Sequence, residues 1–341
     1  MRAILAALFG AVVRVRNAAY DRGLFTAHRI AVPVLSVGNI TLGGAGKTPL
    51  VEHLVSLLHD EGVAPCVVTR GYGRVTRGTV VVSDARGTIV TAREGGDEPV
   101  QMARKFPWLP IVADGLRVRG CGLAIERFQP DVIVLDDAFQ HRACARDLDI
   151  VAIDAARADT ELRMAPLGRL REPLAHLRRA SLIVLTRCSD TVQVDVLAAR
   201  LSSFSDAPIV RTRFAIAALR DALDGRGVGM DAVQERVIAF CGIGSPDAFR
   251  TTLAEAGLAT AALRAFPDHH TYAARDLEAL RVLARRHDTQ TFVTTEKDVA
   301  RLGAAVGGLS DFRILYPEMI TQVLEGADLL RGRVFDSMRR A

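Results

Sequence analysis

The chain has 341 residues, of which 49% are hydrophobic and 24% are charged, and its net charge is +5. This length predicts two domains, and the composition excludes a largely disordered chain. Because the arginines are dispersed and the chain has only one Trp and four Tyr, we expect acidic small molecules or an anionic membrane surface as partners, and no nucleic acid.

The N-terminus begins with an unbroken apolar run over residues 3–13, followed by Arg14, Arg16 and Arg22. A membrane-spanning helix needs about 20 such residues, whereas about 10–14 are typical of an interfacial or buried segment, so the run predicts no transmembrane span. The arginines also stand where a secretory signal would have its neutral cleavage site. Two interpretations remain open: a helix lying on an anionic membrane surface, or a helix packed on the protein's own core.

A glycine-rich loop follows, between an apolar strand-like run at 33–37 and a helical run at 49–55. It fits the phosphate-binding pattern G-x-x-x-x-G-K-[ST], except that its first position is not glycine, and we expect the two central glycines to supply the missing flexibility. Backbone N–H groups would surround phosphate oxygens, the lysine would neutralise phosphate charge, and the last hydroxyl would reach Mg²⁺. The predicted nucleotide-binding residues are Thr41, Leu42, Gly43, Gly44, Ala45, Gly46, Lys47 and Thr48.

Short β-branched runs then alternate with helical patterns such as residues 116–128, which is typical of a mostly parallel α/β sheet flanked by helices. The predicted strands cover residues 65–69, 79–83, 110–113, 132–135, 149–153 and 182–186. A looser stretch at 221–235 precedes a second, smaller α/β region with strands at 237–240 and 291–295. We therefore predict an N-terminal helix over 1–28, a phosphate-binding-loop domain over 29–206 and a second α/β domain over 207–341.

The strand at 132–135 ends in two carboxylates, Asp136 and Asp137. An acidic turn after a buried strand is common in any protein. Beside a phosphate-binding loop, however, a strand-end aspartate is the expected partner for Mg²⁺, because ligand sites of open α/β sheets lie at the carboxyl ends of strands.

Four other polar segments have local interpretations of their own. Asp97 in the sequence GGDEP can be the N-cap of a helix over 100–106, and Arg171-Glu172-Pro173 can begin another helix. Residues 266–270, with two adjacent histidines, can be a polar loop, and a shared metal site there is weakly supported. The segment TRGYGR at 69–74 is either a solvated turn or an anion contact.

Taken together, these motifs resemble one family, the tetraacyldisaccharide 4′-kinases of lipid A biosynthesis. The resemblance extends from the N-terminal apolar segment to about residue 298, and its motifs in chain order are VGN with GGAGKTP, TRGYGR, GGDEP, LDDAFQHR, LREP, PDHH and TTEKD. It implies a kinase that transfers the γ-phosphate of ATP to the 4′-hydroxyl of an acylated glucosamine disaccharide 1-phosphate. It also implies that the kinase acts at the cytoplasmic face of the inner membrane and docks there through the N-terminal helix. No obligate protein partner is implied.

The resemblance implies a role for each matching residue. Asp97 would be the catalytic base, with His269 preferred over His270 as its partner. Lys47 and Arg171 would neutralise charge on the transferring phosphoryl group. Mg²⁺ would be held by Thr48, Asp136, Asp137 and Glu172. The candidates for contacting the disaccharide and its phosphate are Arg70, Tyr72, Arg74, Arg117 and His141.

The alternative function is a GTPase-type accessory or switch protein. Its support is the strand at 182–186, which ends in something like the guanine-reading sequence [NT]-K-x-D. The match is poor, because Arg187 replaces the lysine and one extra residue precedes Asp190.

Overall fold

The computed structural model describes residues 1–341 except residues 88, 158–161, 190, 269 and 341. The chain forms two compact units, Met1–Phe214 with Thr321–Ala341, and Ala215–Ile320. It leaves the first unit within β8 (Ile209–Asp221) and returns to it within β13 (Arg313–Glu325). This division differs from the predicted one, which placed everything after residue 206 in the second domain.

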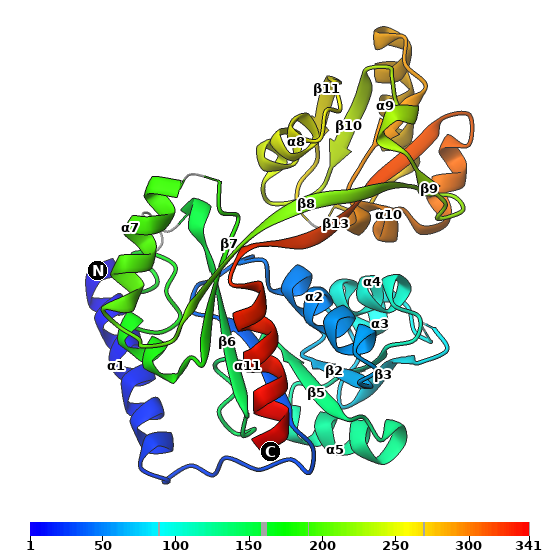
Figure 1. Ribbon diagram of the computed structural model, residues 1–341. Coiled ribbons are helices and arrows are strands. Elements are labelled where there is room, and N and C mark those ends of the chain that lie inside the picture. The colour runs from blue at the N-terminus through cyan, green and yellow to red at the C-terminus, as the bar shows by residue number, and fades with distance from the viewer. Residues whose placement is uncertain (88, 158–161, 190, 269, 341) are drawn as a thin grey trace. The chain divides into compact units, whose positions relative to one another are not determined.

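The first unit contains a sheet with the strand order β8-β7-β6-β1-β5-β2-β4-β3. Figure 1 labels β2, β3, β5, β6, β7 and β8 of this sheet. Only the edge pair β3–β4 is antiparallel among these neighbours, and the other pairs are parallel. The predicted mostly parallel sheet is therefore confirmed. Its strands are β1 (Val34–Asn39), β2 (Pro65–Thr69), β3 (Val80–Asp84), β4 (Pro110–Ala113), β5 (Val132–Asp136), β6 (Leu148–Asp154) and β7 (Leu182–Thr186).

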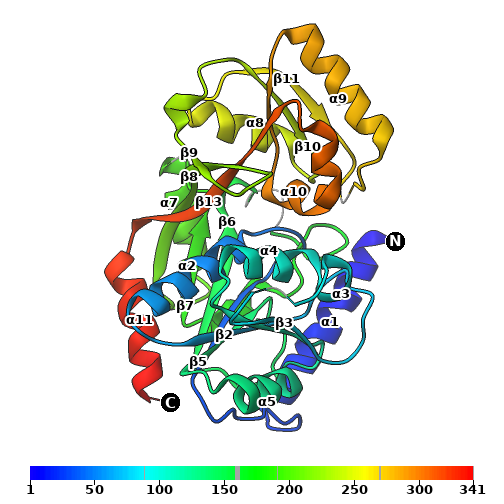
Figure 2. The ribbon, with the colours of Figure 1, turned by 90° about the vertical axis from the view of Figure 1, so that its right-hand side faces the viewer.

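Helices cover both faces of this sheet. Alternate side chains of a strand point to opposite faces, so a strand that is apolar throughout needs a helix on each face to bury them. In β5, Val132 and Val134 pack with the apolar residues of α2, whereas Ile133 and Leu135 pack with those of α5. Figure 2 shows the helices around the strands. They are α2 (Lys47–Asp60), α3 (Ala92–Gly95), α4 (Asp97–Lys105), α5 (Arg117–Phe128), α7 (Thr191–Ser202) and α11 (Ala327–Arg340), with the short 3-10 helices η1 (Ala155–Arg157) and η2 (Leu174–Arg179).

The last helix, α11, explains why the chain returns to the first unit. Leu330 and Val334 are buried in the same cluster as Leu148, Ile150 and Ala152 of β6. The helix thus covers an apolar stretch of the sheet that would otherwise face water. No pattern in the sequence indicates this long-range contact, so the predicted second domain includes residues 321–341.

The N-terminal helix α1 extends over Arg2–Asp21 and is longer than the apolar run within it. An 18-residue window of it has a mean hydropathy of 1.3, and 22% of that window is buried. By length and composition the helix is long enough to cross a membrane, which corrects the expectation that the segment is too short. Most of its apolar surface is exposed, so packing on the protein's own core accounts for little of that surface.

The second unit contains the parallel neighbours β11-β10-β12-β13. Its remaining elements are β10 (Val237–Cys241), β11 (Thr260–Ala265), β12 (Thr291–Val293), α8 (Pro246–Glu255), α9 (Ala274–His287), α10 (Glu296–Leu302) and the 3-10 helix η4 (Gly303–Leu309). The looser stretch at 221–235 contains the 3-10 helix η3 (Met230–Ala232) and the two-residue strand β9 (Gly227–Val228), which pairs with the end of β8. Phe240 and Phe292 are among the buried residues of this unit's core.

Candidate active site

The glycine-rich loop lies between the carboxyl end of β1 and the first turn of α2, where phosphate-binding loops are found. Gly43 has φ of +100° and Gly46 has φ of +75°, so these two positions, rather than Gly43 and Gly44, provide the left-handed backbone. Thr41 needs no such freedom, because its φ is not positive and it forms a strand-like bridge with Leu170. The irregular first position of the motif is thus compatible with the loop.

Lys47 and Arg171 are brought together by one carboxylate. The Lys47 ammonium lies 3.4 Å from Asp137, and the Arg171 guanidinium donates to the two Asp137 oxygens at 3.2 and 3.3 Å. Burial alone would raise the pKa of Asp137, but these two cations outweigh it and the pKa is lowered. Asp137 is therefore a charged counter-ion that holds two cationic groups beside the loop.

Asp136 has a different environment although it is the adjacent residue. It is 5% exposed, one carboxylate oxygen accepts a hydrogen bond from Thr69 at 3.0 Å, and the other oxygen has no hydrogen-bond partner among the described residues. Burial, together with the nearby charges of Glu98 and Asp137, raises the pKa of Asp136 to about 6. Lys47 lowers this pKa only in part, and no ion pair with Asp136 is formed among the described residues, so the site is one that a cation would stabilise.

Glu98 is a residue that the sequence analysis missed. It belongs to the segment GGDEP, and its carboxylate accepts a hydrogen bond from the Thr48 hydroxyl at 3.2 Å. The sequence contains a signal for Glu98, because this residue directly follows Asp97, the predicted base, in the first turn of α4. Oxygen ligands of this kind suit Mg²⁺, and the residues present at this point are the Thr48 hydroxyl, Glu98 and the free oxygen of Asp136.

Asp97 is the first residue of α4, and the N-cap is Gly96 instead, which corrects the local N-cap interpretation. Gly96 has φ of +97°, and a Cβ atom there would lie 3.0 Å from the Tyr72 carbonyl oxygen and 3.2 Å from Gly71. The segments GGDEP and TRGYGR therefore lie against each other at the carboxyl ends of β2 and β4. Close approach of the two loops explains why glycine stands at both positions.

The five candidates for substrate contact have unequal surroundings. Arg70 is exposed and Tyr72 is 79% exposed, so both are open to a ligand. Arg74 donates to the carbonyl oxygens of Ala113 and Gly78, which makes it a support of the loop. Burial and the charges of Arg117 and Arg70 lower the pKa of His141 to about 4, so it is neutral at pH 7.

Arg117 is 2% exposed and donates to the carbonyl oxygens of Asp114 and Asp136 at 2.6 and 3.0 Å. The Arg117 guanidinium thus connects the carboxyl ends of β4 and β5. These contacts favour a positioning role for Arg117 over the substrate contact that the resemblance implied.

Glu172 lies in a buried network that includes the N-terminal helix. Its carboxylate is 1% exposed and accepts hydrogen bonds from Asn17 of α1 at 2.7 Å and Arg179 at 2.6 Å, and it lies 2.9 Å from the His176 ring. Burial alone would raise its pKa, but the hydrogen bonds and the charge of Arg179 lower it. All three partners contact the Oε2 atom, and Oε1 has no hydrogen-bond partner among the described residues. Because Arg179 already neutralises the carboxylate, Glu172 is better suited to structural support than to the Mg²⁺ role that was expected.

The histidine segment belongs to the second unit. His269 lies outside the described residues, so its pairing with Asp97 stays a prediction. The neighbouring His270 has its Nε2 atom 3.0 Å from Asp276 and its ring stacked on Phe266 with 4.7 Å between centroids. His270 is thus fixed by local contacts within its own unit.

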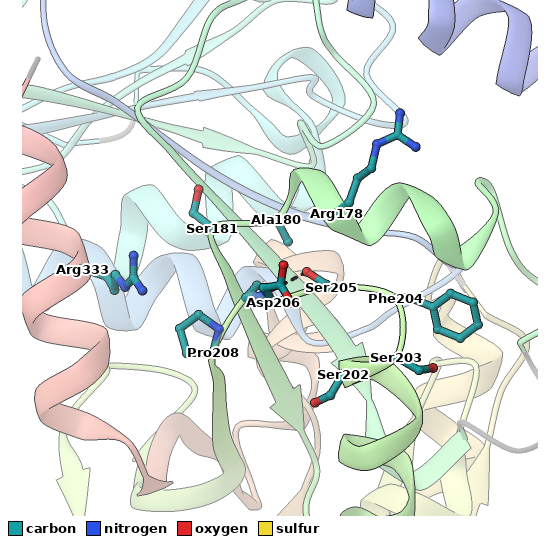
Figure 3. A pocket seen from close by; sticks show the side chains of 11 residues that line it. Arg178, Ala180, Ser181, Ser202, Ser203, Phe204, Ser205, Asp206, Pro208 and Arg333 are labelled. Carbon is teal, nitrogen blue, oxygen red and sulfur yellow. Dashed lines mark hydrogen bonds between the residues drawn. The ribbon is translucent and has the colours of Figure 1, made fainter.

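A cavity of about 510 Å³ lies elsewhere in the first unit (Figure 3). It is lined by residues that precede β7 and β8, such as Ser181 and Pro208, and by Arg333 of α11. β6, β7 and β8 run parallel to β1. The amino ends of β7 and β8 therefore lie at the opposite end of the strands from the glycine-rich loop, which follows the carboxyl end of β1. Among the described residues, no group of three His, Cys, Asp or Glu side chains could hold a metal ion by itself.

Comparisons with known proteins agree on one family. Residues 2–331 match the family described as Tetraacyldisaccharide-1-P 4'-kinase. The chain is 39% identical over 332 residues to a Tetraacyldisaccharide 4'-kinase of Chlorobium limicola, covering 95% of this chain and 94% of the relative. It is 36% identical over 327 residues to that of Anaeromyxobacter dehalogenans, covering 95% and 86%. The crystal structure of LpxK from Aquifex aeolicus in complex with ATP matches with a TM-score of 0.80 at 31% identity, covering 98% of this chain and 97% of that one.

Proposed function

The chain belongs to the tetraacyldisaccharide 4′-kinase family, and on that premise we propose which of its residues carry the reaction. The enzyme transfers the γ-phosphate of ATP to the 4′-hydroxyl of a tetraacylated disaccharide 1-phosphate in lipid A biosynthesis, with ATP and Mg²⁺. The GTPase-type alternative is not favoured by these relationships. The observation that carries the residue assignment is the unpartnered oxygen of Asp136 near Lys47, Asp137 and Glu98, of which Glu98 accepts a hydrogen bond from Thr48.

The glycine-rich loop would bind the nucleotide phosphates through its backbone N–H groups and through Lys47. Asp137 supports this role, because it holds Lys47 and Arg171 close together and thereby places two positive charges at one point. Asp136, Thr48 and Glu98 would hold Mg²⁺, whose chemistry here is to neutralise negative charge on the phosphates. Positioning and charge neutralisation supply most of the catalysis in phosphoryl transfer.

Asp97 would accept the proton of the attacking 4′-hydroxyl. It lies at the start of α4, one residue before the Glu98 that bonds Thr48, and its helix is pressed against the loop that contains Tyr72. The base is thus connected through α4 to the nucleotide site. The exposed Arg70 and Tyr72 are the proposed contacts for the disaccharide and its phosphate, and His141 would contribute hydrogen bonds as a neutral ring.

The test uses γ-labelled ATP and the disaccharide 1-phosphate in mixed micelles. We expect the wild type to transfer label to the lipid, and Asp97→Ala to lose this activity by a factor of about 10² to 10⁴ while its affinity for ATP changes little. A large loss of ATP binding in the Asp97→Ala variant would contradict the base assignment. GTP-selective hydrolysis without a labelled lipid would contradict the kinase assignment for the wild type.

We also propose that α1 docks the kinase on the cytoplasmic face of the inner membrane, where its anionic surface would meet the arginines. Ile4, Leu8 and Val12 are 66, 58 and 66% exposed and are spaced four residues apart, so they form one apolar stripe. Deleting residues 1–16 should reduce lipid use and vesicle binding more than ATP binding. Because that deletion also removes the bond from Arg16 to the Gln140 carbonyl, deletion of residues 2–13 is the cleaner test. Unchanged sedimentation with anionic vesicles would refute docking.

A further inference from the structure

The end of β7 has no role in the function described so far. Thr186 is its last residue and is fully buried, and Arg187 follows with φ of +56°, a left-handed conformation that arginine rarely adopts. In the sequence, this was the segment with a poor match to a guanine-reading motif. A strained arginine persists only where its surroundings hold it, so its contacts are informative.

Both residues contact the backbone of the glycine-rich loop. The Thr186 hydroxyl donates to the carbonyl oxygen of Ala45 at 3.0 Å, and the Arg187 guanidinium donates to the carbonyl oxygen of Gly44 at 3.2 Å. In a planar trans peptide unit the C=O and the following N–H point in opposite directions. Two carbonyl groups directed toward β7 therefore direct the N–H groups of Ala45 and Gly46 away from it, toward the inside of the loop.

Arg187 is itself fixed from two other sides. It forms an ion pair with Asp154, a 5% exposed residue at the end of β6. Its guanidinium also lies 5.3 Å from the centre of the Phe214 ring, at cation–π distance. The same ring lies against the loop, because a Cβ atom on Gly46 would be 2.4 Å from it. Asp154, Phe214 and the strand end thus make one rigid support for the loop.

We infer that Thr186 and Arg187 are positioning residues that hold the N–H groups of Ala45 and Gly46 in the orientation that binds the triphosphate of a nucleotide, whatever its base. The inference rests on the proposed nucleotide site and extends it to two residues without contact to the acceptor. Arg187 thus has a contact with the loop backbone at the place where a guanine-reading motif would have a lysine.

The experiment measures the affinity of Mg²⁺ complexes of ATP, GTP and inorganic tripolyphosphate by calorimetry. We expect Arg187→Ala to weaken all three by the same factor, about tenfold to a hundredfold, because the lost hydrogen bond is charged. The control is Arg331→Ala, which removes an arginine from a surface ion pair with Glu61 at 2.7 Å and should leave all three affinities unchanged. A shift in the ratio of ATP to GTP with unchanged tripolyphosphate binding would overturn the inference in favour of base recognition.

A second pair of variants addresses the chance that Arg187→Ala fails to fold. Thr186→Val keeps the shape of the side chain and removes its hydroxyl, whereas Thr186→Ser keeps the hydroxyl. We expect Thr186→Val to weaken tripolyphosphate several-fold and Thr186→Ser to bind like the wild type. Equal binding by both variants would overturn the inference. None of these measurements uses the lipid, so failure of the wild type to phosphorylate lipid would be seen separately.

Discussion

Two regions of the first unit each contain a buried carboxylate, and their surroundings are opposite. Glu172, beside α1, accepts hydrogen bonds from Asn17 and Arg179 and lies against His176, and its pKa is lowered. Asp136, at the end of β5, has a single hydroxyl partner and faces other carboxylates, and burial raises its pKa to about 6.

The difference separates structural support from a binding function. A carboxylate that already forms an ion pair with an arginine, as Glu172 does, gains less from a metal ion than one without such a pair. A buried carboxylate without such an ion pair, as at Asp136, is stabilised when a proton or a cation is supplied. Both residues stand in conspicuous motifs, but only their partners in space distinguish them.

The largest expected effect is that of Asp136→Asn on catalysis. The substitution keeps the size of the side chain and removes the charge that would hold Mg²⁺, so we expect lipid phosphorylation to fall by at least about a hundredfold. Steady-state transfer of label from ATP measures it, with thermal unfolding as the control for folding. If Asp136→Asn retained full activity and Glu172→Gln lost it, the two carboxylates would have the reverse roles.

Glu172→Gln should instead reduce stability, because it removes the carboxylate that is paired directly with the buried Arg179. Breaking a buried ion pair in this way costs about 3 to 5 kcal/mol in the free energy of unfolding. Urea denaturation measures this loss. The matched control is Asp195→Asn, which breaks a pair with Arg211 in which the aspartate is 62% exposed and should cost less than about 1 kcal/mol. Equal stability of the two variants would show that the network around Glu172 is not a structural support.

The smallest effect is a pH dependence with opposite signs at the two sites. With its pKa near 6, folded Asp136 binds a proton that the unfolded chain has already released, so its contribution to stability is lost as pH rises through about 6. The lowered pKa of Glu172 contributes stability that is lost as pH falls below its ordinary value. We therefore expect the free energy of unfolding of Asp136→Asn, relative to that of the wild type, to increase by about 1 to 3 kcal/mol as the pH rises from 4 to 7. Urea denaturation across this range would contradict the assignment if the difference stayed constant.

Local patterns were enough to predict the strands that position the nucleotide site. β2, β4 and β7 begin and end at the predicted residues, because each is a short β-branched run bounded by polar or turn-forming segments. β8 and β13 were missed, since both strands mix buried and exposed positions and continue from one unit into the other. A pattern within a short window does not show to which unit a strand belongs.

The same limit applies to the site. The glycine-rich loop and the aspartates after β5 could be recognised because their residues are adjacent in sequence. The partners of Glu172 could not, because Asn17 is 155 residues away from it. In the sequence, Arg187 shows only a poor match to a base-reading motif, since its contacts with Gly44 and Asp154 depend on how β6 and β7 pair with the rest of the sheet.

The division of the first unit between residues 1–214 and 321–341 also sets an order of events during protein synthesis. The ribosome must add the whole of residues 215–320 before α11 is made, which takes roughly 5 to 20 seconds at about 5–20 residues per second. Until then, the apolar residues of β6 that Leu330 and Val334 cover remain open to water. We expect the nascent chain to expose this apolar surface for that interval, which is long enough for a chaperone to bind before the last helix emerges.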